Sequence, residues 1–293
     1  MVDIHRTSEF SAFKYQRQVA LYRLRQWLPV IGLFVGSIIV LAPIMWTIST
    51  SLRTGAESFT VPPKWIPTDL EFANYEQVFA RVPFARLILN SATITVSIVL
   101  GQLFTASLSG YAFARLQFPG KHLLFWLILA TMMIPIQATI IPLFVLISGL
   151  GLSDTLIALI LPALPTAFGT FLLRQYFLGV PIELEEAALI DGANLWQIFS
   201  RVYLPLVTSG LAVLGVLTFN FHWNEFFRPL VFLNTLENFP ITLGIFVLQG
   251  YFMTGSISVV LAGVVLSLIP VVIIFLIGQR YLIEGIMRGA LKG

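Results

Sequence analysis

Two clusters of polar side chains stand out in a chain that is otherwise mostly apolar. The first, within residues 181–205, places four acids in nine residues: Glu183, Glu185, Glu186 and Asp191. The second mixes amide, imidazole, indole, carboxylate and guanidinium groups: Asn220, His222, Trp223, Asn224, Glu225 and Arg228. The acids offer ionic contacts to a basic partner. The second cluster offers hydrogen-bond donors and acceptors beside an aromatic face.

The sequence contains no recognisable set of groups for catalysis, metal binding or nucleotide binding. It has no cysteine, and its three histidines, His5, His122 and His222, are too far apart in sequence to predict a metal site. The only Gly-Lys pair, Gly120-Lys121, is followed by histidine, so the phosphate-binding loop Gly-x-x-x-x-Gly-Lys-Ser/Thr is missing. We therefore expect no catalytic site, no metal and no cofactor in this chain.

Composition places these clusters in a membrane protein. Of the 293 residues, 57% are hydrophobic and 11% are charged, and the mean hydropathy is +0.90. A soluble domain has about 25% charged residues, so soluble-enzyme, disordered and disulfide-scaffold classes are excluded. The net charge of +3 comes from scattered residues, and a nucleic-acid partner is not indicated.

The stretches between charges are long enough to cross a bilayer, which takes about 20 apolar helical residues. The final stretch is interrupted by proline, glycine and polar residues over 239–256, which predicts an outer loop with an interfacial or re-entrant piece before one last span. The fold class expected is an all-α integral membrane protein. Its six predicted transmembrane helices are 28–50, 88–114, 122–147, 155–178, 206–228 and 257–279.

The distribution of basic residues predicts the orientation, because cytoplasmic loops retain an excess of lysine and arginine. With the N-terminus inside, twelve of the 17 basic residues face the cytoplasm and five face outward. Both ends, 1–27 and 280–293, are then cytoplasmic, and the first apolar segment is a retained anchor, not a cleaved signal. The outer loop after the first span is expected to carry a short surface helix over 70–81.

The acidic loop has the local signals of a helix, a turn and a second helix. Pro181 suits the start of a helix, and Asp191-Gly192 suits a turn in which glycine takes positive φ. Beyond the turn, a spacing typical of an apolar helix face is found at Leu195, Ile198, Phe199 and Val202. Periodicity alone leaves two interpretations open: an element that docks into a cleft of a soluble partner, or an ordinary interfacial helix capped by acids.

The same loop resembles the EAA signature of ATP-binding cassette importer permeases, in its carbohydrate-importer version. Valine stands at 202 where isoleucine is usual. Residues 90–91, 111–115, 132–135, 174–177 and 223–226 also look like that family. The resemblance implies that the loop contains the coupling helices that contact an ATPase, with Glu186 as the expected ionic contact. The residues it assigns to coupling are Glu186, Ala187, Ala188, Asp191, Gly192, Ala193, Phe199, Val202, Leu204 and Pro205.

The resemblance also implies function and partners. Members of this family include the six-span subunits of maltose and glycerol-3-phosphate importers, in a bacterial or archaeal cytoplasmic membrane. The partners implied are a second homologous permease, two cytoplasmic ATPases that bind ATP and Mg²⁺, and an extracytoplasmic solute-binding protein. This chain would form half of the pathway for a sugar, oligosaccharide, glycoside or polyol phosphate, by alternating access.

The second cluster has two interpretations. Asn220, His222, Trp223, Asn224 and Glu225 could line the pathway for a polyhydroxylated solute. Alternatively, Glu225 pairs with Arg228 at i, i+3 and the other residues lie at the headgroup level. The alternative function class is a secondary transporter or channel driven by an ion gradient, which usually has acids at the membrane midplane. A subunit with a purely structural role is a third option.

Overall fold

The computed structural model describes residues 4–55, 57–59, 65–250 and 256–290, and in these ranges the chain is helical with no β-strand. Three helices are long and apolar enough to cross a membrane by themselves. They are α1 (Ile4–Ser51), through its apolar part Trp27–Ser51, α3 (Phe84–Arg115) and α14 (Ile257–Ala290). They coincide with the first, second and last predicted spans.

The predicted spans 122–147 and 155–178 are bent pairs of helices, and the predicted span 206–228 contains the second helix of a third bent pair. The pairs are α4 (Lys121–Thr131) with α5 (Ile136–Gly149), bent by 98°; Ile157–Ala163 with α7 (Ala167–Leu178), bent by 41°; and Leu195–Leu206 with α11 (Thr208–Trp223), bent by 74°. Pro135 and Pro165 lie in the first two breaks. Proline disfavours helical backbone in the residue before it, so 122–147 is not one continuous helix.

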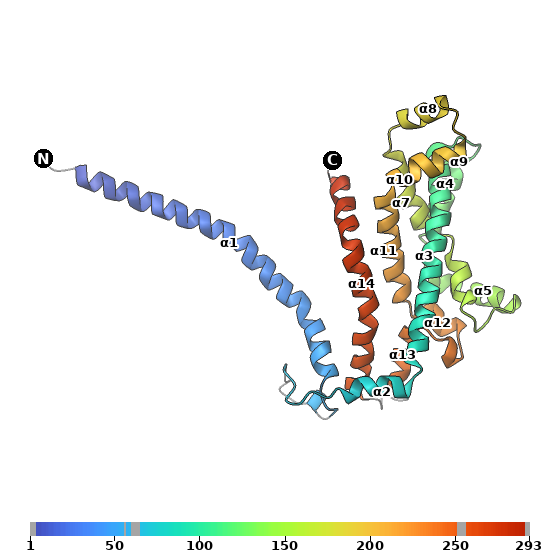
Figure 1. The fold of residues 1–293 in the computed structure, drawn as a ribbon, viewed down its shortest axis with the longest axis horizontal. Coiled ribbons are helices and arrows are strands. Elements are labelled where there is room, and N and C mark those ends of the chain that lie inside the picture. The colour runs from blue at the N-terminus through green and yellow to red at the C-terminus, as the bar shows by residue number, and fades with distance from the viewer. Residues whose placement is uncertain (1–3, 56, 60–64, 251–255, 291–293) are drawn as a thin grey trace.

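The helices α7 and α11 pack against α3, and α14 packs against α11 (Figure 1). At one end of this bundle, the end at which α14 finishes, lies α8 (Glu183–Ile190); at the other end lies α2 (Ala73–Arg81), which confirms the predicted short helix. The chain returns to the α2 end through α12 (Phe227–Phe232), the 3-10 turn η4 (Leu236–Asn238) and α13 (Ile241–Leu248). The predicted re-entrant piece contains α13, and residues 251–255 of it lie outside the described residues.

The closest packing in the bundle is between α3 and α7. A Cβ atom added to Gly110 would lie 3.0 Å from the backbone nitrogen of Arg174 and 3.2 Å from the carbonyl carbon of Leu173. Glycine at this point therefore lets the two backbones approach each other. Buried apolar clusters surround α3 along its length, around Leu87, Ile98 and Tyr111.

The long helix α1 leaves the bundle and is attached to it only near its C-terminal end (Figure 1). There the Asn74 amide of α2 donates to the carbonyls of Ser51 and Arg53, at 3.0 and 2.8 Å, and the Ser51 and Tyr75 hydroxyls lie 2.8 Å apart. Over Trp27–Ser51 its apolar side chains are largely exposed. Lipid or another protein must cover them.

Asp154, between α5 and α6 (Ile157–Ile160), holds two connections together. Its carboxylate accepts hydrogen bonds from the backbone N–H groups of Asn234 (2.9 Å) and Thr235 (3.0 Å) and from the Thr235 hydroxyl. The Asn238 amide donates to the Asp154 carbonyl at 2.7 Å. Asp154 itself has a φ of +57°, a conformation that Asp and Asn tolerate better than most residues.

Candidate functional site

The acidic loop folds as two helical segments joined by a turn, as predicted. The first is α8, and the second consists of α9 (Leu195–Gln197), the π-helical turn η3 (Ile198–Tyr203) and α10 (Leu204–Leu206). Gly192 has a φ of +81°, which confirms the predicted turn. A Cβ here would meet no atom within 4 Å, so only the backbone conformation favours glycine.

A capping box, not recognised in the sequence, starts the second segment. The Asn194 side chain accepts from the Gln197 backbone at 2.9 Å, and the Gln197 side chain accepts from the Asn194 backbone at 2.8 Å. The pattern Asn-x-x-Gln was a readable signal. Together with Gly192, this box fixes where the second segment begins.

The loop presents acids and apolar side chains together on its exposed surface. Glu183, Glu186 and Asp191 are exposed, and so are large apolar side chains, with Ile190 86% exposed and Trp196 61%. The residues that the resemblance assigns to coupling divide in two. Exposed members are Glu186, Ala187, Asp191, Gly192 and Pro205; partly or fully buried members are Ala188, Ala193, Phe199, Val202 and Leu204.

The apolar face predicted after the turn is partly wrong. Ile198 and Phe199 are buried as expected, but Leu195 is exposed, and Tyr203 instead of Val202 is the fully buried residue one turn later. The reason is the π-helical hydrogen bonding of η3, which places more residues in each turn than an α-helix. A spacing rule based on 3.6 residues per turn could not anticipate this shift.

One acid of α8 points into the bundle. Glu185 is half-buried, and its carboxylate accepts a hydrogen bond from the hydroxyl of Tyr203. The Arg115 guanidinium of α3 lies 4.9 Å from the centre of the Tyr203 ring. Sequence reasoning missed this group, because residues 115, 185 and 203 share no sequence periodicity and meet only in the folded bundle.

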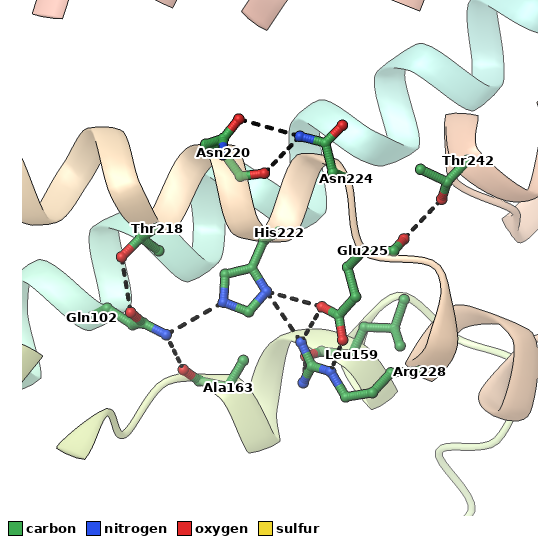
Figure 2. A network of polar contacts seen from close by, with 10 residues as sticks. All are labelled: Gln102, Leu159, Ala163, Thr218, Asn220, His222, Asn224, Glu225, Arg228 and Thr242. Carbon is green, nitrogen blue, oxygen red and sulfur yellow. Dashed lines mark hydrogen bonds and ion pairs between the residues drawn. The ribbon is translucent and has the colours of Figure 1, made fainter. Parts of the chain in front are cut away.

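The second cluster surrounds a buried arginine near the start of α12 (Figure 2). Arg228 is 4% exposed and donates through both Nε and Nη2 to the carboxylate of Glu225. His222 Nδ1 lies 3.0 Å from a Glu225 oxygen and 3.1 Å from Arg228 Nη2. The pairing at i, i+3 that the sequence suggested is therefore present.

This ion pair connects several helices through further polar contacts (Figure 2). Arg228 Nη1 donates to the Leu159 carbonyl of α6 at 3.2 Å, and Thr242 of α13 donates to the Glu225 carbonyl at 2.8 Å. Gln102 of α3 lies 3.4 Å from His222 Nε2 and accepts from Thr218 at 3.0 Å. Gln102 was not singled out in the sequence, although a glutamine inside an apolar span is a signal of a buried polar contact.

The three other residues predicted to line a pathway lie differently. Trp223 is 3% exposed, stacks on Phe219 and donates to the Ser267 carbonyl of α14 at 3.2 Å. Asn220 and Asn224 are exposed, and the Asn224 amide donates to the Asn220 carbonyl at 2.8 Å. Among the residues predicted to line a pathway, the two asparagines are thus the exposed ones. Within the described ranges, no three His, Cys, Asp or Glu side chains form a group that could hold a metal ion.

Comparisons with known proteins connect this geometry to a transport family. Residues 102–288 match the sequence profile described as "Binding-protein-dependent transport system inner membrane component". The chain is 34% identical to the arabinooligosaccharides transport system permease protein AraQ of Halalkalibacterium halodurans, over 91% of this chain and 96% of that one. It is 32% identical to the sn-glycerol-3-phosphate transport system permease protein UgpE of Escherichia coli, over 90% and 97%.

A solved structure has the same fold over nearly the whole chain. It belongs to a bacterial ABC transporter involved in the import of the acidic polysaccharide alginate. The alignment has a TM-score of 0.76 and 29% sequence identity, and covers 88% of this chain and 96% of that one.

Proposed function

The chain belongs to the family of binding-protein-dependent transport system inner membrane components, and we propose that it is the permease subunit of an ATP-driven importer of carbohydrates or polyol phosphates. The observation that carries the proposal is the pairing of this family with an acidic helical hairpin at one end of an apolar bundle. The arabinooligosaccharide, glycerol-3-phosphate and alginate importers among its relatives support the substrate class.

We propose a six-span topology in a bacterial or archaeal cytoplasmic membrane, with each bent helix pair counting as one span and both ends in the cytoplasm. The excess of basic residues in the loops and termini assigned to the cytoplasm supports this orientation. The α8 end of the bundle is then cytoplasmic, and the α2 end faces outward.

We propose that α8 and the turn at Gly192 couple the bundle to a separate ATPase. Glu183, Glu186 and Asp191 provide negative charge, and Ile190 and Trp196 provide apolar surface, as a docking element needs. The complete importer would hold a second homologous permease, two ATPase subunits that bind ATP and Mg²⁺, and an extracytoplasmic solute-binding protein. Closure of the ATPases would move the hairpin and switch the pathway between inward-facing and outward-facing states.

We propose that Asn220 and Asn224 contribute to the solute pathway, because they are the exposed polar groups of the second cluster. In this proposal His222, Glu225 and Trp223 hold the surrounding helices in place. Asn224→Ala is then expected to change the apparent KM for solute uptake, with the ATPase subunits still bound. An unchanged KM for both Asn220→Ala and Asn224→Ala would remove these residues from the pathway.

Reconstitution tests the proposed function against the ion-gradient alternative. The complete importer in liposomes is expected to accumulate labelled solute only with ATP and the binding protein present, and not with an imposed proton or sodium gradient. Glu225, the one acid in the six predicted spans, is ion-paired with Arg228, which leaves no free carboxylate there for proton or sodium coupling. Gradient-driven uptake by the lone polypeptide would contradict the proposal.

A further inference from the structure

We propose that Glu185, Tyr203 and Arg115 form the internal connection through which movement of α8 reaches the α3–α7 pair. The inference rests on the proposed coupling function and deepens it. It assigns Glu185 a role different from that of the exposed acids on the same helix.

The first link is between the hairpin and the bundle. The Tyr203 hydroxyl donates to the Glu185 carboxylate, and the Tyr203 ring is fully buried between Tyr111 and Phe177, with ring centres at 5.3 and 6.0 Å. The ring therefore cannot follow Glu185 without disturbing α3 and α7. In contrast, Glu183 and Glu186 are exposed and have no side-chain partner among the described residues.

The second link is Arg115, which contacts Tyr203 and the end of α7 at once. Its guanidinium faces the Tyr203 ring and donates through Nη2 to the carbonyls of Phe177, at 2.7 Å, and Val180. Carbonyls at a helix C-terminus lack partners within the helix, so a cation that binds them fixes the helix end. Arg115 thus joins η3 to the last turn of α7.

The third link is reciprocal. Arg174 of α7 donates through Nε to the Phe113 carbonyl at 3.1 Å, so each helix of the pair supplies an arginine to the C-terminal end of the other. Lys121 adds a hydrogen bond to the Leu116 carbonyl at 2.7 Å. With the close backbone approach at Gly110, these contacts make α3 and α7 one rigid body at this end. A displacement of α8 must move that body or break the bond between Glu185 and Tyr203.

The test uses the complete importer in lipid nanodiscs and compares Tyr203→Phe, Glu185→Ala and Glu185→Gln with wild type. Tyr203→Phe keeps the ring and removes only the donor. The matched control is Tyr176→Phe, whose hydroxyl has no partner in the described structure. Two quantities are measured: solute transported per ATP hydrolysed, and amide hydrogen exchange of residues 183–190.

Tyr203→Phe and Glu185→Ala are each expected to lower the transport per ATP several-fold and to speed α8 exchange about tenfold, as expected for loss of a hydrogen bond to a charged group. The double variant should be no worse than either single variant, because both remove the same bond. Glu185→Gln keeps an acceptor oxygen and should lie between wild type and Glu185→Ala. The control Tyr176→Phe should behave as wild type.

The outcomes separate this inference from the function on which it rests. If wild-type ATPase subunits bind and drive uptake, but Tyr203→Phe has the wild-type ratio and the wild-type exchange rate, the connection is wrong and the coupling function stands. Additive effects of the two single variants would also overturn it. If no ATPase binds the wild-type chain, both proposals fail together.

Discussion

Arg228 carries a charge in the interior of the bundle, and Glu225 balances it. Glu225→Gln is expected to destabilise the subunit by about 3–5 kcal/mol, because removal of one partner leaves a buried charge uncompensated. The measurement is the thermal midpoint of the detergent-solubilised chain, followed by size-exclusion chromatography. The double variant Glu225→Gln/Arg228→Gln should recover much of the loss, and a double variant less stable than the single one would contradict the role of the pair.

Gly192 is the residue of the hairpin for which backbone conformation dictates the side chain. Its φ of +81° costs a residue with a Cβ about 1–2 kcal/mol, and β-branched residues more. Gly192→Val is therefore expected to reduce ATPase association and uptake, whereas Gly192→Asn, which tolerates this conformation, should retain most of both. Co-purification of the ATPase with each variant measures this, and equal behaviour of valine and asparagine would refute the turn as the cause.

Asp154 predicts a dependence of stability on pH. Burial alone raises its pKa, but the hydrogen bonds from Thr235 and Asn234 outweigh it, so its pKa lies below the usual value. A lowered pKa stabilises the fold above the unfolded-state value of about 3.9, and this contribution is lost as the pH falls through the folded-state value. Asp154→Asn removes the charge and suits the positive φ.

The check is the thermal midpoint of wild type and Asp154→Asn between pH 7 and pH 3. The wild-type advantage over the variant is expected at pH 7 and should begin to shrink as the pH falls below about 4. An advantage that stays constant to pH 3 would show that Asp154 acts through shape and not through charge.

At the scale of single residues, the sequence predicted those features that depend only on residues close together in the chain. The pair Asp191-Gly192 predicted the turn, and the i, i+3 spacing indicated the contact between Glu225 and Arg228. It did not find the partner of Glu185, because Tyr203 lies on another element and reaches it only through the fold. It also grouped Trp223 with the pathway, since composition does not tell which side of a helix faces the core.

The pairing of α3 with α7 is the element on which the proposed connection depends. Gly110→Ala is expected to destabilise the bundle by about 1–3 kcal/mol, because the new Cβ would press on backbone that cannot rotate away. The matched control is Gly149→Ala at the end of α5, where a Cβ meets nothing within 4 Å. Its effect should be neutral or slightly stabilising. The measurement is the thermal midpoint of each variant. Equal midpoints would show that α3 and α7 can move apart to accept a Cβ at residue 110 without loss of stability.

Hydropathy predicted the helical type and the approximate position of the elements. It did not predict whether each span is one unbroken helix. The spans 28–50, 88–114 and 257–279 fall within unbroken helices. Pro29 and Pro43 in the first of these spans and Pro270 in the last do not interrupt the helix. At 132–135 and 164–166 the chain breaks at a proline, and the size of each bend depends on packing against neighbours. A count of apolar residues contains no information about that packing. The π-helical turn η3 was not predicted for the same reason.

At the scale of the whole molecule, the orientation can be tested directly because the chain has no cysteine. Single cysteines can be placed at the two ends of the bundle without removing native thiols. Glu76→Cys on α2 is expected to react with a membrane-impermeant maleimide added outside intact cells, and Asp191→Cys only after the cells are opened. The experiment uses the chain expressed alone, so that no partner covers either site. Labelling of Asp191→Cys in intact cells would reverse the proposed topology.

The exposed apolar surface of α1 affects how the stability of the isolated chain is interpreted. Near its C-terminal end the helix contacts α2 and α14, and over most of Trp27–Ser51 its apolar side chains are exposed. Whatever covers that limb, lipid or a neighbouring subunit, supplies its tertiary contacts. A melting temperature of the isolated polypeptide is therefore measured without these contacts. It should rise with the concentration of the lipid or subunit that covers the helix, because binding to the folded state stabilises it by mass action.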